Sequence, residues 1–157
     1  MNIFGKATIN PVLFMTGKIS GYIVYIIFIL ELSGIITFSV HHLFMLQCIA
    51  FVIGAFSLGI MIISFLNLGS AIRFGIPADS TELKTHGLYR FSRNPMYLSF
   101  NLLILCAMLF TAHPVIICLG VYSIVIYHFI ILGEEKFLEQ RFGETFLQYK
   151  QKVRRYL

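Results

Sequence analysis

The chain has 157 residues, of which 58% are hydrophobic and only 12% are charged, and its mean hydropathy is +0.84. Soluble domains carry roughly 25% charged residues, and one globular core cannot hide so much apolar surface. The composition therefore excludes a soluble enzyme, a secreted disulfide scaffold and a disordered tail. The length is that of one domain.

Two long stretches of the chain are almost free of formal charge. Residues 19–72 contain one charged side chain, Glu31, and residues 94–133 contain none. A membrane-spanning helix needs about 20 apolar residues, so each stretch has room for two. We predict an all-α polytopic membrane protein in which residues 1–157 form a single integral-membrane domain. About four transmembrane helices are expected, as two hairpins followed by a C-terminal amphipathic helix.

Polar turns divide these stretches into the individual spans. In chain order, the expected spans cover residues 19–40, 43–66, 95–110 and 114–132, with a loop at 67–93 and a tail at 134–157. The first hairpin turns at His41 and His42, and the third span begins at Pro95, a residue suited to the first turn of a helix. The third span is short, because some 16 residues measure roughly 24 Å against a hydrocarbon core of about 30 Å.

Four glycines mark places where helices could approach closely. Gly17 and Gly21 form a G-x-x-x-G pattern, which is typical of helix contacts in membranes but weak by itself. Gly54 and Gly59 of the second span are further candidate contact points.

The tail from residue 134 to residue 157 combines many charges with one apolar stripe. The stripe is spaced 4, 4, 3, 4 and 3 residues apart and comprises Leu138, Phe142, Phe146, Tyr149, Val153 and Tyr156. This spacing predicts one face of a helix, which Gly143 is expected to kink. Two interpretations stay open: a helix lying on the membrane surface, and a lid over the polar ends of the spans.

The charges flank the apolar stretches, and the turns after the first and third spans carry no Lys or Arg. The positive-inside rule then places both termini and the 67–93 loop in the cytoplasm, and we expect a bacterial inner membrane. We therefore expect the basic residues behind the net charge of +5 to face anionic lipid headgroups and not to bind nucleic acid. Cys48, Cys106 and Cys118 lie in apolar spans without C-x-x-C spacing, so neither a metal site nor a disulfide framework is expected.

Polar side chains at the cytoplasmic ends of the last two spans form the candidate site. Asn94, Tyr97 and Asn101 share one face of the third span, and Glu134 and Glu135 follow the fourth. Because a short turn joins these spans, we expect the two polar faces to meet near the cytoplasmic surface.

Arg90 and Arg93 precede the third span and add two cations to this group. Salt bridges from these arginines to Glu134 or Glu135 are one interpretation. The other is a pocket for a ligand that carries both an ammonium group and a carboxylate, since glutamate and arginine recognise those groups.

The same region resembles the signature G-x-Y-x-x-x-R-H-P-x-Y of integral-membrane methyltransferases. These are the isoprenylcysteine carboxyl methyltransferase and phospholipid methyltransferase families, and the match runs from Gly87 to Tyr97. Their later motifs follow in order, E-E-x-x-L at 134–138, F-G-x-x-Y-x-x-Y at 142–149 and V-x-R at 153–155. The resemblance covers residues 72–155. Asn94 replaces the usual histidine of the signature, Phe146 replaces a tyrosine, and the family's terminal proline is absent.

The resemblance implies a methyltransferase that uses S-adenosylmethionine and a lipophilic or membrane-embedded acceptor. An isoprenylcysteine carboxylate, a phospholipid amine and a small thiol remain open as acceptors. The cofactor-binding residues implied by the motifs are Arg93, Asn94, Pro95, Tyr97, Glu134 and Glu135. Arg90 is a candidate catalytic residue at the same end.

Glu31 is a second catalytic candidate, because an acid inside the membrane is costly and often functional. It could attract an amine or act as a base, and the alternative is a protonated side chain that hydrogen-bonds a neighbouring helix. His128 is a weaker candidate base, and a packed, hydrogen-bonded histidine is the favoured interpretation.

Two other functions remain open. A sterol- or enone-reductase-like enzyme using NADPH has a similar arginine-rich stretch, but Met96 and the Glu134–Glu135 pair favour the methyltransferase. A non-enzymatic membrane scaffold would leave the polar motifs at the ends of two spans unexplained.

Overall fold

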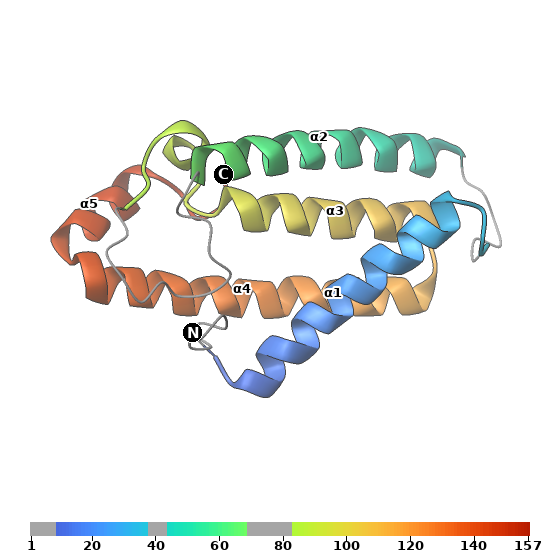
Figure 1. The fold of residues 1–157 in the computed structure, drawn as a ribbon, viewed down its shortest axis with the longest axis horizontal. Coiled ribbons are helices and arrows are strands. Elements are labelled where there is room, and N and C mark those ends of the chain that lie inside the picture. The colour runs from blue at the N-terminus through green and yellow to red at the C-terminus, as the bar shows by residue number, and fades with distance from the viewer. Residues whose placement is uncertain (1–8, 38–43, 69–82) are drawn as a thin grey trace.

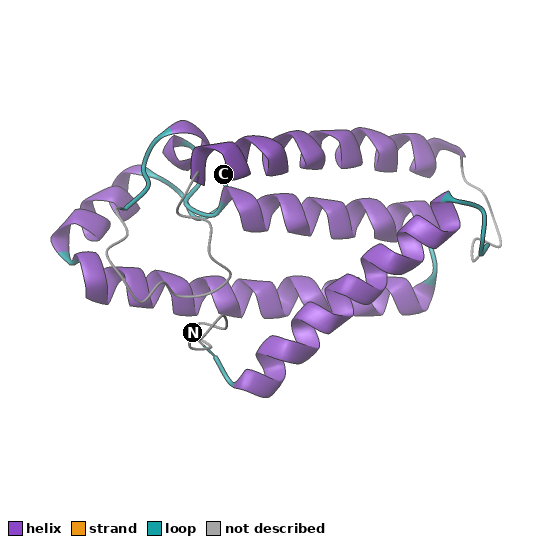
Figure 2. Ribbon diagram, in the orientation of Figure 1, coloured by secondary structure: helices purple, strands orange, loops and turns teal. Residues whose placement is uncertain are grey.

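The computed structural model describes residues 9–37, 44–68 and 83–157. Within these ranges the fold is helical, with one isolated β-bridge and no strand (Figures 1 and 2). The helices are α1 (Pro11–Leu32), α2 (Phe44–Leu68), the 3-10 helix η2 (Gly87–Arg90), α3 (Pro95–Thr111), α4 (Pro114–Phe142) and α5 (Glu144–Lys152). The predicted all-α class with a C-terminal helix is confirmed.

Helix α1 lies closer to the N-terminus than the predicted span at 19–40. It begins at Pro11, after Asn10, whose side chain accepts a hydrogen bond from the backbone N–H of Val12 at 2.9 Å. It ends at Leu32, and Gly34 follows with a φ of 75°, a conformation that suits glycine. Local capping therefore fixes both ends, where hydropathy alone suggested a later start. The predicted turn at residues 41–42 lies outside the described residues.

Helices α2 and α3 pack along their lengths, and their bounds are close to the predicted 43–66 and 95–110. The hydroxyl of Ser57 donates to the backbone carbonyl of Ser99 at 2.7 Å. A Cβ at Gly54 would lie 2.9 Å from Sγ of Cys106, so this glycine is a contact point as predicted. Gly59 has no neighbour within 4 Å of a built Cβ, so the same prediction is wrong for Gly59.

Helix α1 crosses α4 and also contacts α3 (Figure 1). A Cβ at Gly17 would overlap the side chain of Ile126, and one at Gly21 would lie 2.8 Å from Oγ of Ser123. Ser123 donates to the carbonyl of Gly17 at 3.0 Å, and Ser20 donates to a carbonyl of α4 at 2.8 Å. The G-x-x-x-G pattern therefore marks a real helix contact, one that brings the start of α1 against the middle of α4.

Helix α4 has 29 residues and a length of about 43 Å, which exceeds a hydrocarbon core of about 30 Å. It continues ten residues beyond the predicted end at Leu132. The helical path breaks at Gly143, where φ is 52°, and α5 turns back toward the bundle. The predicted kink is confirmed.

The apolar stripe of the tail faces the protein. Phe146, Tyr149 and Val153 are buried against Leu138, Phe142 and Leu83. This burial contradicts the interpretation in which the stripe lies on the membrane surface. The stripe instead docks α5 onto α4 and onto the chain before η2.

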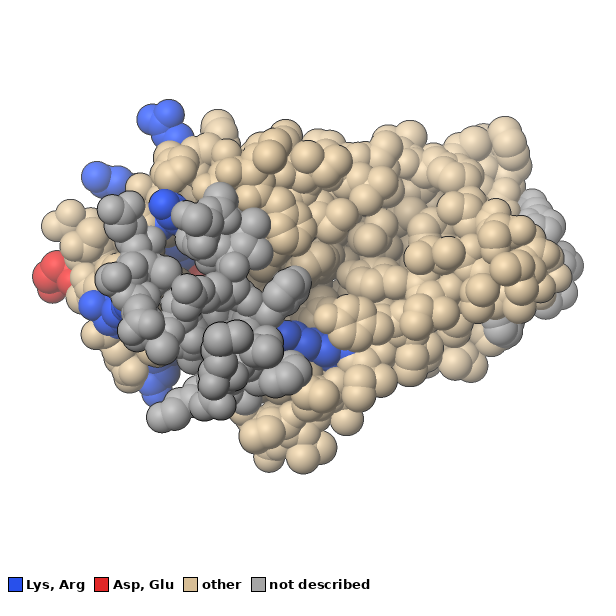
Figure 3. Space-filling view, in the orientation of Figure 1, with Lys and Arg blue, Asp and Glu red and all other residues tan. Residues whose placement is uncertain are grey.

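The protein is an integral membrane protein. Helices α1, α2 and α4 are long and apolar enough to cross a membrane, and the apolar α3, with 17 residues, runs beside α2. Many large apolar side chains on these helices are exposed, as expected for a surface that faces lipid. On the face drawn in Figure 3, most of the charged side chains lie toward the end that holds α5.

Candidate functional site

Two segments that are far apart in sequence meet at the α5 end of the bundle. The chain before α3 runs alongside the C-terminal segment, and a parallel β-bridge joins Ser92 to Arg154. The backbone N–H of Arg93 donates to the carbonyl of Arg154 at 2.9 Å. The hydroxyl of Ser92 donates to the carbonyl of Arg155 at 3.2 Å. This pairing brings two arginine side chains toward the end of α4.

The carboxylate of Glu135 lies at the centre of this arrangement, and the residue is only 4% exposed. The guanidinium of Arg93 lies 3.0 Å from it, and that of Arg155 lies 2.9 Å from it. The amide of Asn94 donates to Oε1 of Glu135 at 3.1 Å. A buried carboxylate is tolerable here because two cations and one amide surround it. We call Arg93, Asn94, Glu135 and Arg155 the ion cluster.

Pro95 fixes the direction in which these side chains leave the backbone. It is buried at the first position of α3, where a helix needs no backbone donor. Asn94 precedes it with a φ of −132° and a ψ of 54°, outside the helical region, and makes no side-chain cap. Its side-chain amide is therefore free to donate to the carboxylate of Glu135.

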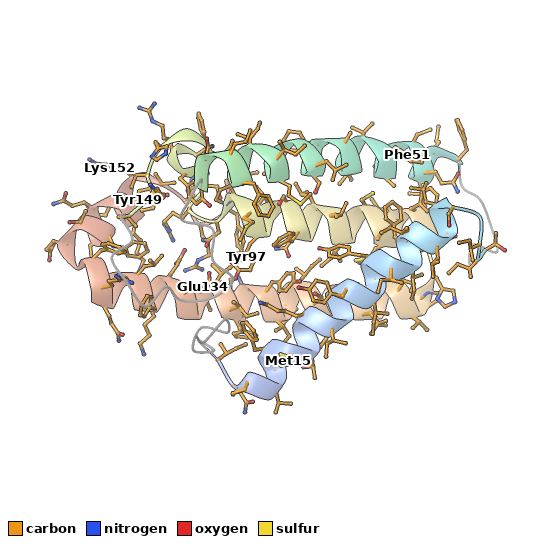
Figure 4. All side chains as sticks on the ribbon, in the orientation of Figure 1. Met15, Phe51, Tyr97, Glu134, Tyr149 and Lys152 are labelled. Atoms are coloured by element: carbon orange, nitrogen blue, oxygen red, sulfur yellow. The ribbon has the colours of Figure 1, made fainter. Side chains whose placement is uncertain are left out.

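A second carboxylate, that of Glu134, lies next to the ion cluster. Tyr97 donates to its Oε1 at 2.6 Å, and Figure 4 shows these two side chains between α3 and α4. The Tyr97 ring also contacts the ring of Tyr127, with centroids 5.9 Å apart. Lys18 of α1 interacts electrostatically with Glu134. Three helices thus contribute to the surroundings of this carboxylate.

The C-terminal residues are held in place by two further contacts. The hydroxyl of Tyr149 donates to the carbonyl of Tyr89 at 2.6 Å, and burial raises the pKa of Tyr149 to about 12. Burial likewise raises the pKa of Tyr89 to about 12. Nδ1 of His128 and the hydroxyl of Tyr156 lie 2.7 Å apart with their rings stacked, as favoured for a packed histidine. The hydrogen bond to the Glu135 carboxylate raises the pKa of Arg155.

The structure brings most of the sequence-predicted site residues together. Those that lie in or beside the ion cluster are Arg93, Asn94, Pro95, Tyr97, Glu134 and Glu135. The salt bridge between Arg93 and Glu135 agrees with the interpretation in which an arginine before α3 pairs with a glutamate of α4. Asn101 lies further along α3, and its Oδ1 is buried with no hydrogen-bond partner in the described ranges.

Two candidates lie elsewhere. Arg90 makes no ion pair with either glutamate and lines a separate cavity beside α2. Glu31 sits at the C-terminal end of α1, where Phe28 contacts Phe110 with ring centroids 5.3 Å apart. That is the opposite end of the bundle from Glu134 (Figure 4). Hydropathy and spacing identified Arg90 and Glu31 as charged residues in or beside spans, but they did not show which residues of other helices lie next to them.

The sequence interpretation missed Arg155 as a member of the site. The signal was available, because Arg155 occupies the arginine of the V-x-R motif at 153–155. The parallel pairing with residues 92–94 could not be read from the sequence, since it depends on the turn at Gly143.

Comparison with known proteins places this geometry in a family. The sequence profile described as phospholipid methyltransferase matches residues 43–145. The chain belongs to the phospholipid methyltransferase family. An uncharacterized protein of Haemophilus influenzae (strain ATCC 51907 / DSM 11121 / KW20 / Rd) is 44% identical over 64 residues, which are 40% of this chain and 100% of that protein. No solved structure matches the chain. The match to the phospholipid methyltransferase family spans α2, α3 and α4 and includes most of the ion cluster.

Proposed function

We propose that this chain transfers a methyl group from S-adenosylmethionine to a lipophilic or membrane-embedded acceptor. The observation that carries the proposal is the meeting of two family motifs at one place. Arg93 and Asn94 of the first motif bond to Glu135 of the second, while Tyr97 bonds to Glu134. We further propose that this end of the bundle faces the cytoplasm of a bacterial inner membrane.

The hydrogen-bond donors and acceptors of the site fit a ligand that carries both an ammonium group and a carboxylate. Oε1 of Glu134 accepts from Tyr97, and Oε2 has no hydrogen-bond partner in the described part of the chain. Arg155 uses Nε and Nη2 on Glu135, which leaves Nη1 without a partner among the described residues. A free carboxylate oxygen suits an ammonium group, and a free guanidinium N–H suits a carboxylate. When bound, S-adenosylmethionine supplies a methyl group on a positively charged sulfur.

The protein's own residues would then act by position. Arg93 spans the two halves of the site, because its Nη1 also donates to the carbonyl of Lys150 at 3.1 Å and to that of Val153. The C-terminal segment thereby packs against Glu135, which is buried, and limits the access of water to its carboxylate. Holding two reactants in a fixed orientation is the main contribution to such a displacement.

The acceptor is proposed to arrive from the bilayer. The bundle has exposed apolar side chains along its helices, so a lipid can reach the polar end without crossing water. An isoprenylcysteine-like carboxylate and a phospholipid-like amine both meet this requirement.

Ligand binding to the purified full chain tests the cofactor. Thermal unfolding is followed during titration with S-adenosylmethionine, S-adenosylhomocysteine and NADPH. A ligand that binds only the folded state at 100 times its Kd adds about 2.7 kcal/mol to the free energy of unfolding. We expect this stabilisation from the two adenosyl ligands, and we expect Glu134→Gln to lose most of it.

Glu139→Gln is the matched control, because Glu139 forms an exposed ion pair with Lys150 on the same side of the molecule. It is expected to bind both adenosyl ligands like the original chain. Stabilisation by NADPH alone would assign the protein to the reductases. No response to any of the three ligands would favour a scaffold.

A further inference from the structure

A cavity separate from the ion cluster lies between the C-terminal end of α2 and η2. Its volume is about 600 Å³, and the described residues that line it are Ile63, Asn67, Gly87, Leu88, Arg90 and Phe91. No lining residue forms an ion pair with Glu134 or Glu135. The cavity is therefore separate from the site proposed for methyl transfer.

One side of the cavity offers hydrogen-bond donors without acceptors. Arg90 is exposed and forms no ion pair within the described ranges. Nδ2 of Asn67 is buried and has no hydrogen-bond partner among the residues that the structure describes. Its amide lies directly against Gly87, whose φ of 61° and missing side chain make room for it. A cation and an unsatisfied amide N–H on one wall are suited to an anion.

The remaining wall is apolar. Ile63, on the membrane helix α2, is 47% exposed, and Phe91 is 71% exposed. Both are large side chains that gain free energy when hydrocarbon covers them. The cavity thus combines an anion-binding side with a hydrocarbon-binding side at the end of a membrane helix. Basic pockets at this position relative to membrane helices accept lipid headgroups.

We propose that the cavity binds an anionic phospholipid, with the phosphate on Arg90 and Asn67 and an acyl chain against Ile63 and Phe91. The inference does not depend on methyl transfer or on S-adenosylmethionine. Such a lipid connects α2 to η2, and η2 leads within three residues to Arg93. The bound lipid therefore stabilises the segment that carries the first half of the ion cluster.

Lipid binding to the purified full chain in a non-ionic detergent tests the proposal. The probes are dioctanoyl-phosphatidylglycerol, dioctanoyl-phosphatidylcholine and inorganic phosphate, and the measurements are the thermal unfolding midpoint and native mass spectrometry. We expect phosphatidylglycerol to bind and to raise the midpoint, with a Kd at least tenfold lower than that of phosphatidylcholine. Inorganic phosphate, which lacks the acyl chain, is expected to have little effect.

Two variants address the site directly. Arg90→Gln removes the cation, and Asn67→Asp places a negative charge against the phosphate with almost no change in shape. Each is expected to weaken phosphatidylglycerol binding at least tenfold. Arg154→Gln is the matched control, because Arg154 is an exposed arginine outside the cavity, and it is expected to bind like the original chain.

Each of the following results would contradict the lipid-binding proposal in a different way. Equal binding of phosphatidylglycerol by the original chain and by Arg90→Gln would overturn the proposal, as would equal binding of the two lipids. An equal response to inorganic phosphate would show a small-anion site without a lipid. Should one variant unfold without lipid, the other decides the question. Adenosyl-ligand binding measured on the same samples shows separately whether the proposed function holds.

Discussion

Replacing Glu135 by glutamine tests whether the ion cluster holds the C-terminal segment to the bundle. The substitution keeps the shape of the side chain but leaves Arg93 without its countercharge, and the Arg93 side chain is only 8% exposed. Breaking a buried pair in this way costs about 3–5 kcal/mol. Arg93 retains two backbone carbonyls as acceptors, those of Lys150 and Val153, so we expect a loss near the lower end, about 3 kcal/mol.

The free energy of unfolding is measured by titration with denaturing detergent in mixed micelles. Glu139→Gln serves as the control, because its pair with Lys150 is about 40% exposed and such pairs contribute about 0–1 kcal/mol. Combining Arg93→Gln with Glu135→Gln should cost less than the sum of the single substitutions, since Arg93 is then no longer a buried cation without its countercharge. A loss below about 1 kcal/mol for Glu135→Gln would refute the reasoning.

The remaining predictions concern packing, pH and the variant motif residue. Gly17→Val should destabilise the protein by about 1–3 kcal/mol in the same titration through a clash with α4, whereas Gly59→Val should have little effect because its site is open. The raised pKa of Tyr149, about 12 against an ordinary value of 10, means that its contribution to stability is complete below pH 10 and is lost as the pH rises from 10 to 12. Tyr149→Phe should cost about 1 kcal/mol at neutral pH by removing the hydrogen bond to Tyr89, and it should reduce the loss of stability between pH 10 and 12; an unchanged pH profile would contradict the pKa raised by burial. Asn94→Leu should cost about 1.5–3 kcal/mol by removing a hydrogen bond to a charged group, and Asn94→His should restore most of it.

The overall fold was predictable because membrane helices leave a strong signal in the sequence. Charge-free stretches and polar turns located α2 and α3 closely and gave the start of α4. The ends of α1 were missed because hydropathy does not register capping by Asn10 or the turn at Gly34. The same limitation hid the continuation of α4 past Leu132, where the side chains become polar although the backbone stays helical.

The site was predictable where its members share a helix face or a motif. Helical spacing and the short turn between α3 and α4 predicted that their polar ends meet, and in the structure Tyr97 contacts Glu134 while Asn94 contacts Glu135. Contacts that depend on the reversal of the chain at Gly143 could not be predicted, because the spacing of apolar residues does not tell in which direction the next helix runs after a helix ends. The burial of the apolar stripe and the approach of the C-terminal segment both follow from that reversal.

Transfer of a labelled methyl group is the most direct test of the central claim. The full chain is reconstituted in nanodiscs made from a bacterial membrane lipid extract and incubated with S-adenosylmethionine labelled on its methyl group. We predict label in the organic phase with the original chain and with Glu139→Gln, and a loss of at least tenfold with Glu134→Gln. Equal labelling by the original chain and by Glu134→Gln, or no labelling by a well-folded chain, would contradict the account.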